Sequence, residues 1–177
     1  MEIERKFLIP KLPDNLESYT FHLIEQGYLC TDPVVRIRRQ DDDYILTYKG
    51  KGLMCREEYN LPLNQEAYQH LKEKIDGNLI SKKRYLIPID HELTIELDVF
   101  HAPFETLRLA EVEFPSEDAA NAFVPPAWFG TDVTMDGHYH NSYLSKVSLE
   151  LLFLRIPDLH QGQSLGRCCL SGYPSIL

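Results

Sequence analysis

The sequence predicts a β-dominated α+β fold: a closed eight-stranded antiparallel β-barrel with helices packed outside. Strand-like runs make up most of the chain before Pro115. The turns between several of these runs are short, which favours antiparallel neighbours because parallel strands need a long crossover. Within the runs, apolar and charged residues alternate with the period of two that a strand with unlike faces requires. Eight such strands are enough to close a barrel, and closure removes exposed edges.

The predicted strands follow one another along the chain. They cover Glu2–Ile9, His22–Cys30, Val34–Gln40, Tyr44–Lys49, Cys55–Leu63, Leu79–Pro88, Glu92–Phe100 and Leu107–Phe114. Aspartate favours turns, so Asp41-Asp42-Asp43 is predicted to turn between the third and fourth strands, and Asp90-His91 between the sixth and seventh.

Two helices are predicted between and after these strands. The first covers Gln65–Asp76, with Asn64 as its N-cap and Gly77 at its end. One face of it carries a helical stripe formed by Tyr68, Leu71 and Ile75. The second helix begins after Ser116, its N-cap, and stops before Pro125-Pro126. Both patterns are typical of amphipathic helices that cover a sheet from outside.

The chain divides into one predicted domain, residues 1–150, and a C-terminal extension, residues 151–177. A chain of 177 residues is long enough for one domain with a sizeable core. The extension begins with an apolar run at Leu151–Ile156 and continues with glycine, serine and proline in no periodic pattern. We assign the extension no role.

Composition and charge exclude several classes of protein. The 18 Lys and Arg residues against 27 Asp and Glu residues give a formal net charge of -9. This charge argues against nucleic-acid binding, because a phosphate backbone requires a basic surface. No apolar run approaches the length of a membrane span, and the chain begins directly with a charged strand. We therefore expect a cytoplasmic protein with no membrane association.

Strong charges of one sign recur at every second residue, which places them on one face of each strand. Such close like charges repel each other unless a group of opposite charge lies between them. If these faces point inward, the barrel encloses seven cations: Lys6, Arg36, Arg38, Lys49, Arg56, Lys82 and Arg84. Seven acids lie among them: Glu2, Glu4, Glu58, Glu96, Asp98, Glu111 and Glu113. Two plainer interpretations remain open, namely solvated outer strand faces and internal salt bridges that need no ligand.

An interior lined in this way suits a polyanion together with a hard metal ion. Carboxylate oxygens are the ligands that Mg²⁺ and Mn²⁺ prefer. Guanidinium and ammonium groups bind phosphate oxygens. Cations and a divalent metal around a phosphate chain are the parts used in phosphoryl transfer.

An ordered series of motifs resembles the CYTH superfamily, the triphosphate tunnel metalloenzymes. The chain opens with Glu2-Ile3-Glu4-Arg5-Lys6, which resembles the Glu-x-Glu-x-Lys signature of that superfamily. The resemblance covers roughly residues 1–145 and runs through Gln26-Gly27-Tyr28-Leu29, Val35-Arg36-Ile37-Arg38, Leu46-Thr47-Tyr48-Lys49-Gly50, Arg56-Glu57-Glu58, Lys82-Lys83-Arg84-Tyr85, Ile95-Glu96-Leu97-Asp98-Val99-Phe100, Ala110-Glu111-Val112-Glu113-Phe114, Val133-Thr134 and Tyr139-His140-Asn141-Ser142. It implies an eight-stranded antiparallel tunnel that binds a triphosphate group.

The resemblance also implies roles for individual residues. The metal-binding acids are Glu2, Glu4, Glu111 and Glu113. The phosphate-binding residues are Lys6, Arg36, Arg38, Lys49, Arg56, Lys82 and Arg84. Asp98, Glu58 and Lys6 are the expected catalytic residues: Asp98 near a second metal or the attacking water, and Glu58 as an acid that orients basic neighbours or assists the metal.

Several residues depart from this pattern or stay outside it. Asn60 stands where many members of the superfamily have an acid, and His138 stands where Arg or Lys is common. A metal site formed by His138 and His140 is a weaker alternative. Tyr28 is expected to pack rather than to take part in catalysis. Arg5 lies on the apolar face of its strand, and we expect its long side chain to extend to the surface.

The favoured hypothesis is a triphosphatase that depends on Mg²⁺ or Mn²⁺. Its substrate is a triphosphate-containing small molecule, either inorganic tripolyphosphate or a small organic triphosphate, and it releases orthophosphate. One alternative is an adenylate cyclase on the same scaffold, although the sequence shows no clear adenine pocket. Another is a polyphosphate-binding module without catalysis, although binding alone needs only the cations. We expect a monomer or a homodimer.

Overall fold

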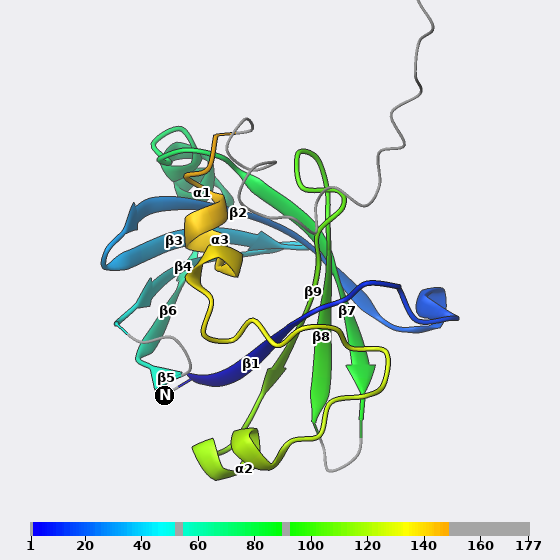
Figure 1. Ribbon diagram of the computed structural model, residues 1–177. Coiled ribbons are helices and arrows are strands. Elements are labelled where there is room, and N and C mark those ends of the chain that lie inside the picture. The colour runs from blue at the N-terminus through cyan, green and yellow to red at the C-terminus, as the bar shows by residue number, and fades with distance from the viewer. Residues whose placement is uncertain (1, 52–54, 90–92, 149–177) are drawn as a thin grey trace, which may run out of the picture.

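The computed structural model describes residues 2–51, 55–89 and 93–148, and it describes only the backbone of Glu2, Cys55 and Arg56. Its strands are β1 (Glu2–Leu8), β2 (Phe21–Thr31), β3 (Val34–Gln40), β4 (Asp43–Lys49), β5 (Cys55–Arg56), β6 (Glu58–Leu63), β7 (Ile80–Pro88), β8 (Thr94–Phe100) and β9 (Arg108–Glu113). They form one curled antiparallel sheet in the order β5-β1-β9-β8-β7-β2-β3-β4-β6 (Figure 1). The C-terminal extension at 151–177 lies outside the described residues.

The β-dominated fold and its antiparallel pairing are confirmed, and the strand positions follow the predicted runs closely. One predicted run, Cys55–Leu63, is divided at Glu57 into β5 and β6. The two parts have different neighbours, since β5 pairs with β1 and β6 pairs with β4. They therefore stand at opposite ends of the sheet order. Complete closure of the sheet into a barrel stays a prediction.

Both predicted helices are present, with the predicted caps. In α1 (Gln65–Lys72) the Asn64 side chain accepts a hydrogen bond of 2.7 Å from the backbone of Ala67. The helix ends at Lys72 rather than at Asp76, because the chain there turns away and the Asp76 N–H donates to the carbonyl of Tyr28 at 2.7 Å. In α2 (Glu117–Ala122) the Ser116 side chain accepts from the backbone of Ala119 at 3.1 Å.

Apolar strand faces and the helices that cover them form the core. α1 packs on the outside of β3 and β4, where Tyr68 is fully buried, and α2 packs on β1. One hydrophobic cluster includes Ile3, Leu97 and Val112, which alternate with charged residues along their strands. This packing orients their charged neighbours Glu4, Glu96, Glu111 and Glu113 toward the opposite, concave side of the sheet.

Three short helices were not predicted. They are the 3-10 helices η1 (Leu16–Ser18) and η2 (Gly137–Tyr139) and the helix α3 (Asn141–Leu144). Helices this short carry too few residues for a periodic pattern. Whereas α1 and α2 pack outside as predicted, α3 stands on the concave side, in contact with β2 (Figure 1). Within the described residues, no helix is long and apolar enough to cross a membrane.

Candidate functional site

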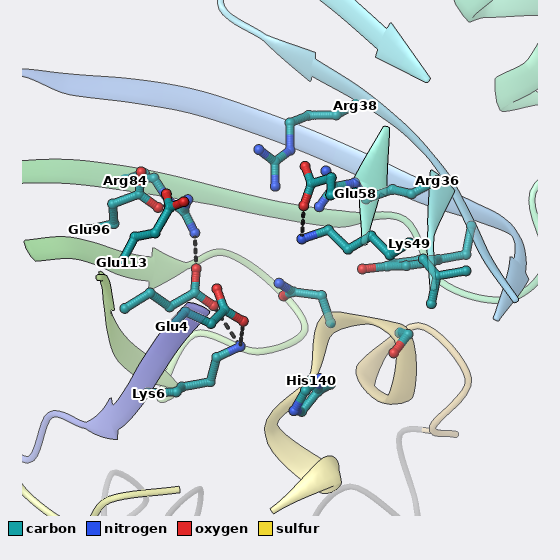
Figure 2. Close-up of a pocket in the computed structure, with 15 residues that line it drawn as sticks. Glu4, Lys6, Arg36, Arg38, Lys49, Glu58, Arg84, Glu96, Glu113 and His140 are labelled. Atoms are coloured by element: carbon teal, nitrogen blue, oxygen red, sulfur yellow. Dashed lines mark hydrogen bonds and ion pairs between the residues drawn. The ribbon is translucent and has the colours of Figure 1, made fainter. Parts of the chain in front are cut away.

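A cavity of about 190 Å³ lies on the concave side of the sheet. Charged side chains from seven strands point into it, and α3 closes one side (Figure 2). It is lined by Glu4, Lys6, Tyr28, Val34, Arg36, Arg38, Lys49, Glu58, Arg84, Glu96, Glu111, Glu113, His140, Asn141 and Ser142. The predicted inward orientation of the charged strand faces is therefore present in the fold.

Strand register places one cation of β1, Lys6, directly opposite an acid of β9. Lys6 of β1 is paired with Glu111 of β9, and their side chains meet at 2.7 Å between Nζ and Oε1. The Lys6 Nζ also lies 3.8 Å from Oε1 of Glu4. Burial alone would raise the pKa of Glu111, but Lys6 and Arg84 outweigh it and hold that pKa well below its usual range.

Arg84 connects the acids of β8 and β9. Its guanidinium donates to Glu96 and to Glu111, and it binds Asp98 at 2.7 Å from Nε and 2.6 Å from Nη2. Burial alone would lower the pKa of Arg84, but the three carboxylates outweigh it and raise that pKa well above its usual value. Arg84 is thus a permanent cation held in a fixed orientation.

Lys82 and Asp98 lie on the same strand faces as Arg84 and Glu96 but are not among the residues that line the cavity. Both side chains are fully buried, and the Lys82 ammonium donates to the Asp98 carboxylate. Burial, together with repulsion from Arg84, lowers the pKa of Lys82 to about 8. In this structure, Asp98 therefore contacts two cations through its own oxygens and reaches the cavity through Arg84.

Two guanidinium groups on β3, those of Arg36 and Arg38, have no acidic partner within the described part of the chain. Arg36 donates from Nη2 to Oγ1 of Thr47 at 2.9 Å, and Arg38 donates from Nη2 to Oε1 of Gln26 at 3.3 Å. Among the residues that the structure describes, the Nε groups of both arginines are buried without a hydrogen-bond partner. Burial and repulsion from Arg36 and Arg84 lower the pKa of Arg38 to about 9. Both arginines line the cavity, so an anion bound there would pair with their guanidinium groups.

The neighbouring acid Glu58 is held by a lysine and an amide. Its Oε2 lies 2.5 Å from the Nζ of Lys49, and its Oε1 accepts from Nδ2 of Asn60 at 2.9 Å. Asn60 in turn accepts from Thr47 at 2.7 Å through Oδ1. The neutral Asn60 thus links Glu58 to the Thr47 hydroxyl that Arg36 also contacts, without adding another negative charge.

Carboxylates crowd together at the other end of the cavity. Glu113 pairs in register with Glu4, and burial and the negative charges of Glu96, Glu4 and Glu58 raise the pKa of Glu113. A divalent cation would relieve this repulsion, and its preferred ligands are carboxylate oxygens. Among the described side chains, no three acidic, His or Cys residues form a ready metal site. The side chain of Glu2, another predicted ligand, lies outside the described part of the chain.

Most of the predicted site residues line one cavity. They are Glu4, Lys6, Arg36, Arg38, Lys49, Glu58, Arg84, Glu111 and Glu113. Lys82 and Asp98 do not line it, and the Arg56 side chain is not described. Tyr28, which was expected only to pack, is 3% exposed and lines the cavity as well.

The α3 wall was not predicted as part of the site. His140, Asn141 and Ser142 line the cavity. The sequence indicated them through a motif to which we assigned no role, and His140 also through the weaker alternative of a metal site with His138. His138 is instead exposed and lies 2.7 Å from Asp136, measured from Nδ1 to Oδ1. The sequence alone could not show that His140 lines the cavity and that His138 does not.

Comparison with known proteins finds one domain family and two relatives that share the same description. The profile of the CYTH domain matches residues 1–124. An inorganic triphosphatase from Nitrosomonas europaea is 42% identical over 147 residues, which are 81% of this chain and 96% of that protein. An inorganic triphosphatase from Acetivibrio thermocellus is 36% identical over 151 residues, which are 82% of this chain and 93% of that protein.

Two solved structures are also similar to this chain. The crystal structure of an inorganic triphosphatase, 38% identical, matches with a TM-score of 0.64 over 84% of this chain and 96% of its own. A putative adenylyl cyclase from Hippeastrum, 17% identical, matches with a TM-score of 0.55 over 68% of this chain and 83% of its own. The second likeness shows the fold alone.

Proposed function

This chain belongs to the CYTH domain family, and on that basis we propose that it is an inorganic triphosphatase that hydrolyses tripolyphosphate inside the cavity. Its relatives at 42% and 36% identity are both inorganic triphosphatases. The single structural observation that carries the proposal is the pair of arginines Arg36 and Arg38, which line the charged cavity and whose buried Nε groups have no partner among the described residues. Leaving such groups unpaired is costly, and phosphate oxygens would pair them.

Different cations would bind different ends of the phosphate chain. Arg36 and Arg38 would bind one end, with Lys49 beside them, whereas Lys6 and Arg84 lie among the acids at the other end (Figure 2). Arg56 completes the predicted phosphate-binding set, and Lys82, which does not line the cavity, would act through its electrostatic field. Contacts at several points supply the positioning on which phosphoryl transfer largely depends.

The acids would hold the metal. We assign this role to Glu2, Glu4, Glu111 and Glu113, of which Glu111 is shared with Lys6 and Arg84. Bound Mg²⁺ or Mn²⁺ supplies charge neutralisation of phosphate oxygens and a more acidic bound water. The choice between the two ions stays a prediction.

Hydrolysis adds the oxygen of water to the terminal phosphorus and breaks the bridging P–O bond, so that orthophosphate and diphosphate leave. Glu58 lines the cavity and is fixed by Lys49 and Asn60, which suits it to orient that water and accept its proton. Lys6 would stabilise charge on the transferred phosphoryl group. Asp98 would contribute by holding Arg84 and Lys82 in place.

We also infer that the sheet closes into a tunnel. β5 pairs with β1 at one end of the sheet order, β6 pairs with β4 at the other, and only Glu57 separates the two strands in sequence. The chain itself thus joins the two ends. A cytoplasmic location and a monomeric or homodimeric state stay predictions.

The size of the cavity favours a small inorganic substrate. Pockets for drug-sized organic ligands typically measure on the order of 300–1,000 Å³, compared with about 190 Å³ here. The lining is charged and polar apart from Val34 and Tyr28, which leaves little apolar surface on which a base could stack.

The test is to incubate the purified chain with tripolyphosphate or ATP, each with Mg²⁺ or Mn²⁺. We expect orthophosphate from tripolyphosphate, only in the presence of the metal, and much slower reaction of ATP. Cyclic AMP as the product from ATP would support the adenylate cyclase alternative instead. Tight binding of tripolyphosphate without turnover would identify a binding module.

A further inference from the structure

Arg5 lies on the outer face of β1, between two residues of the cavity, and it does not extend freely into solvent. Its side chain is 19% exposed. The guanidinium donates to Oδ2 of Asp132 from Nη2 at 2.6 Å and from Nε at 3.2 Å. From Nη1 it donates to the carbonyls of Ala120 at 3.0 Å and Phe123 at 3.1 Å. Arg5 thus ties α2 and the segment after it to β1.

Asp132 connects this contact to the backbone of the cavity strand. Its Oδ1 accepts from the backbone N–H of Thr134 at 2.9 Å and from the Thr134 hydroxyl at 2.5 Å. Because that hydroxyl donates to Asp132, its oxygen is free to accept, and it accepts from the backbone N–H of Lys6 at 3.0 Å. The N–H of Val133 also donates to the carbonyl of Lys6 at 2.8 Å.

The same segment leads directly to the α3 wall. Val133 accepts from the N–H of Asp136 at 3.0 Å, and Asp136 caps η2 by accepting from the N–H of His138 at 3.0 Å. Val133, Tyr139 and Leu144 are buried in one hydrophobic cluster. The segment from Asp132 to Leu144 is therefore one continuously bonded and packed unit, so a shift at Asp132 is transmitted to the cavity wall.

The wall presents polar groups that suit a phosphate. His140 is 8% exposed and lines the cavity. The Oδ1 of Asn141 is buried without a partner among the residues described. An amide turned by 180° places its Nδ2 donors in the same position, so Asn141 can donate to an oxygen of the ligand.

We propose that Arg5 is a positioning residue: with Asp132 and Thr134 it fixes the segment that carries His140, Asn141 and Ser142, so that these side chains bind the phosphate chain opposite the β-strands. The identity of the ligand rests on the proposed function. The positioning of the segment by Arg5, Asp132 and Thr134 rests only on the contacts described above. Arg5 touches no cavity group directly and acts through Asp132.

The test measures tripolyphosphate binding by calorimetry without metal, in Arg5→Lys and Asp132→Asn. Lysine keeps the charge but loses the planar array of donors, so we expect Kd to rise roughly tenfold, which is the loss of about one charged hydrogen bond. Arg108→Lys is the matched control, because Arg108 also bonds a carbonyl on the outside, that of Pro10 at 3.3 Å. An unchanged Kd in a folded Arg5→Lys protein overturns the proposal.

A double-mutant cycle separates positioning from general destabilisation. In an Asn141→Ala background, Arg5→Lys should raise Kd clearly less than tenfold, because one of the contacts that it positions is already gone. The same tenfold change in both backgrounds would contradict the proposal. Loss of thermal stability alone would not produce this non-additivity.

Hydrogen exchange gives a readout that needs no ligand. Arg5→Lys should speed amide exchange across residues 133–144 and leave the exchange of β7 unchanged. Equal exchange of 133–144 in the variant and the unmodified protein overturns the proposal that Arg5 holds this segment. If the unmodified chain neither binds nor hydrolyses tripolyphosphate, the proposed function fails. The exchange result then still decides whether Arg5 holds the segment.

Discussion

Replacing Asp98 with asparagine removes the negative charge that neutralises two buried cations, Lys82 and Arg84. The side chains of Asp98 and Lys82 are 0% exposed and that of Arg84 is 6% exposed. Removing one partner of a buried ion pair typically costs about 3–5 kcal/mol. Asparagine can still accept one hydrogen bond, and Lys82, with its pKa of about 8, can lose its proton. We therefore expect the low end of that range, about 3 kcal/mol.

Urea denaturation followed by the fluorescence of Trp128, the single tryptophan of the chain, measures this change. The same loss corresponds to a decrease of Tm of about 6–12 °C for a chain of this length. Glu105→Gln is the control: Glu105 is exposed, and a surface substitution of this kind should alter stability by less than about 0.5 kcal/mol.

A second variant shows whether charge is the cause. In Asp98→Asn/Lys82→Met, the cation that has lost its partner is also removed, so stability should recover part of the loss relative to Asp98→Asn alone. If Asp98→Asn unfolds at the same urea concentration as the unmodified chain, the reasoning on buried charge is refuted. If the double variant is less stable than the single one, Lys82 matters through packing instead.

The remaining predictions concern the ligands. Glu4→Gln should abolish metal-dependent turnover without changing Tm, whereas full activity would refute the role of Glu4 in metal binding. Arg36→Met should raise the KM for tripolyphosphate at least tenfold, the cost of one lost charged hydrogen bond of about 1.5–3 kcal/mol, whereas the exposed Arg39 gives a matched Arg39→Met control without this effect. The phosphate binds the protonated form of Arg38, so the affinity for tripolyphosphate should decrease as pH rises through the Arg38 pKa of about 9. Binding at pH 9 should therefore take up protons. Calorimetry in two buffers with different ionisation enthalpies measures this uptake. Equal affinity at pH 8 and pH 10 would contradict the expected decrease.

The strands and their faces could be predicted because strand geometry is local. Successive side chains point to opposite faces whatever the neighbouring strand is, so Glu4 and Lys6 share a face and Ile3 lies on the other. The N-caps Asn64 and Ser116 were predictable for the same reason, since each bonds within its own first turn.

Contacts between distant parts of the chain could not be predicted. Arg5 was expected to extend to the surface, but its partner Asp132 lies far along the chain and reaches it only after the 130–134 segment packs beside β1. The α3 wall was missed because four residues show no helical period. In sequence, His138 and His140 look alike, yet only His140 is among the residues that line the cavity.

The sequence by itself determined which residues face inward, and thereby the mixture of cations and acids that indicates a triphosphate and a metal. Only the tertiary structure decided which of the described cations are paired with acids and which are not. Arg84 and Arg36 occupy the same kind of position in their strands, but strand register places Asp98 opposite the first and Thr47 opposite the second. Register is set by the packing of whole apolar faces, a cooperative property of many residues, and it therefore determines which cations remain available for a ligand.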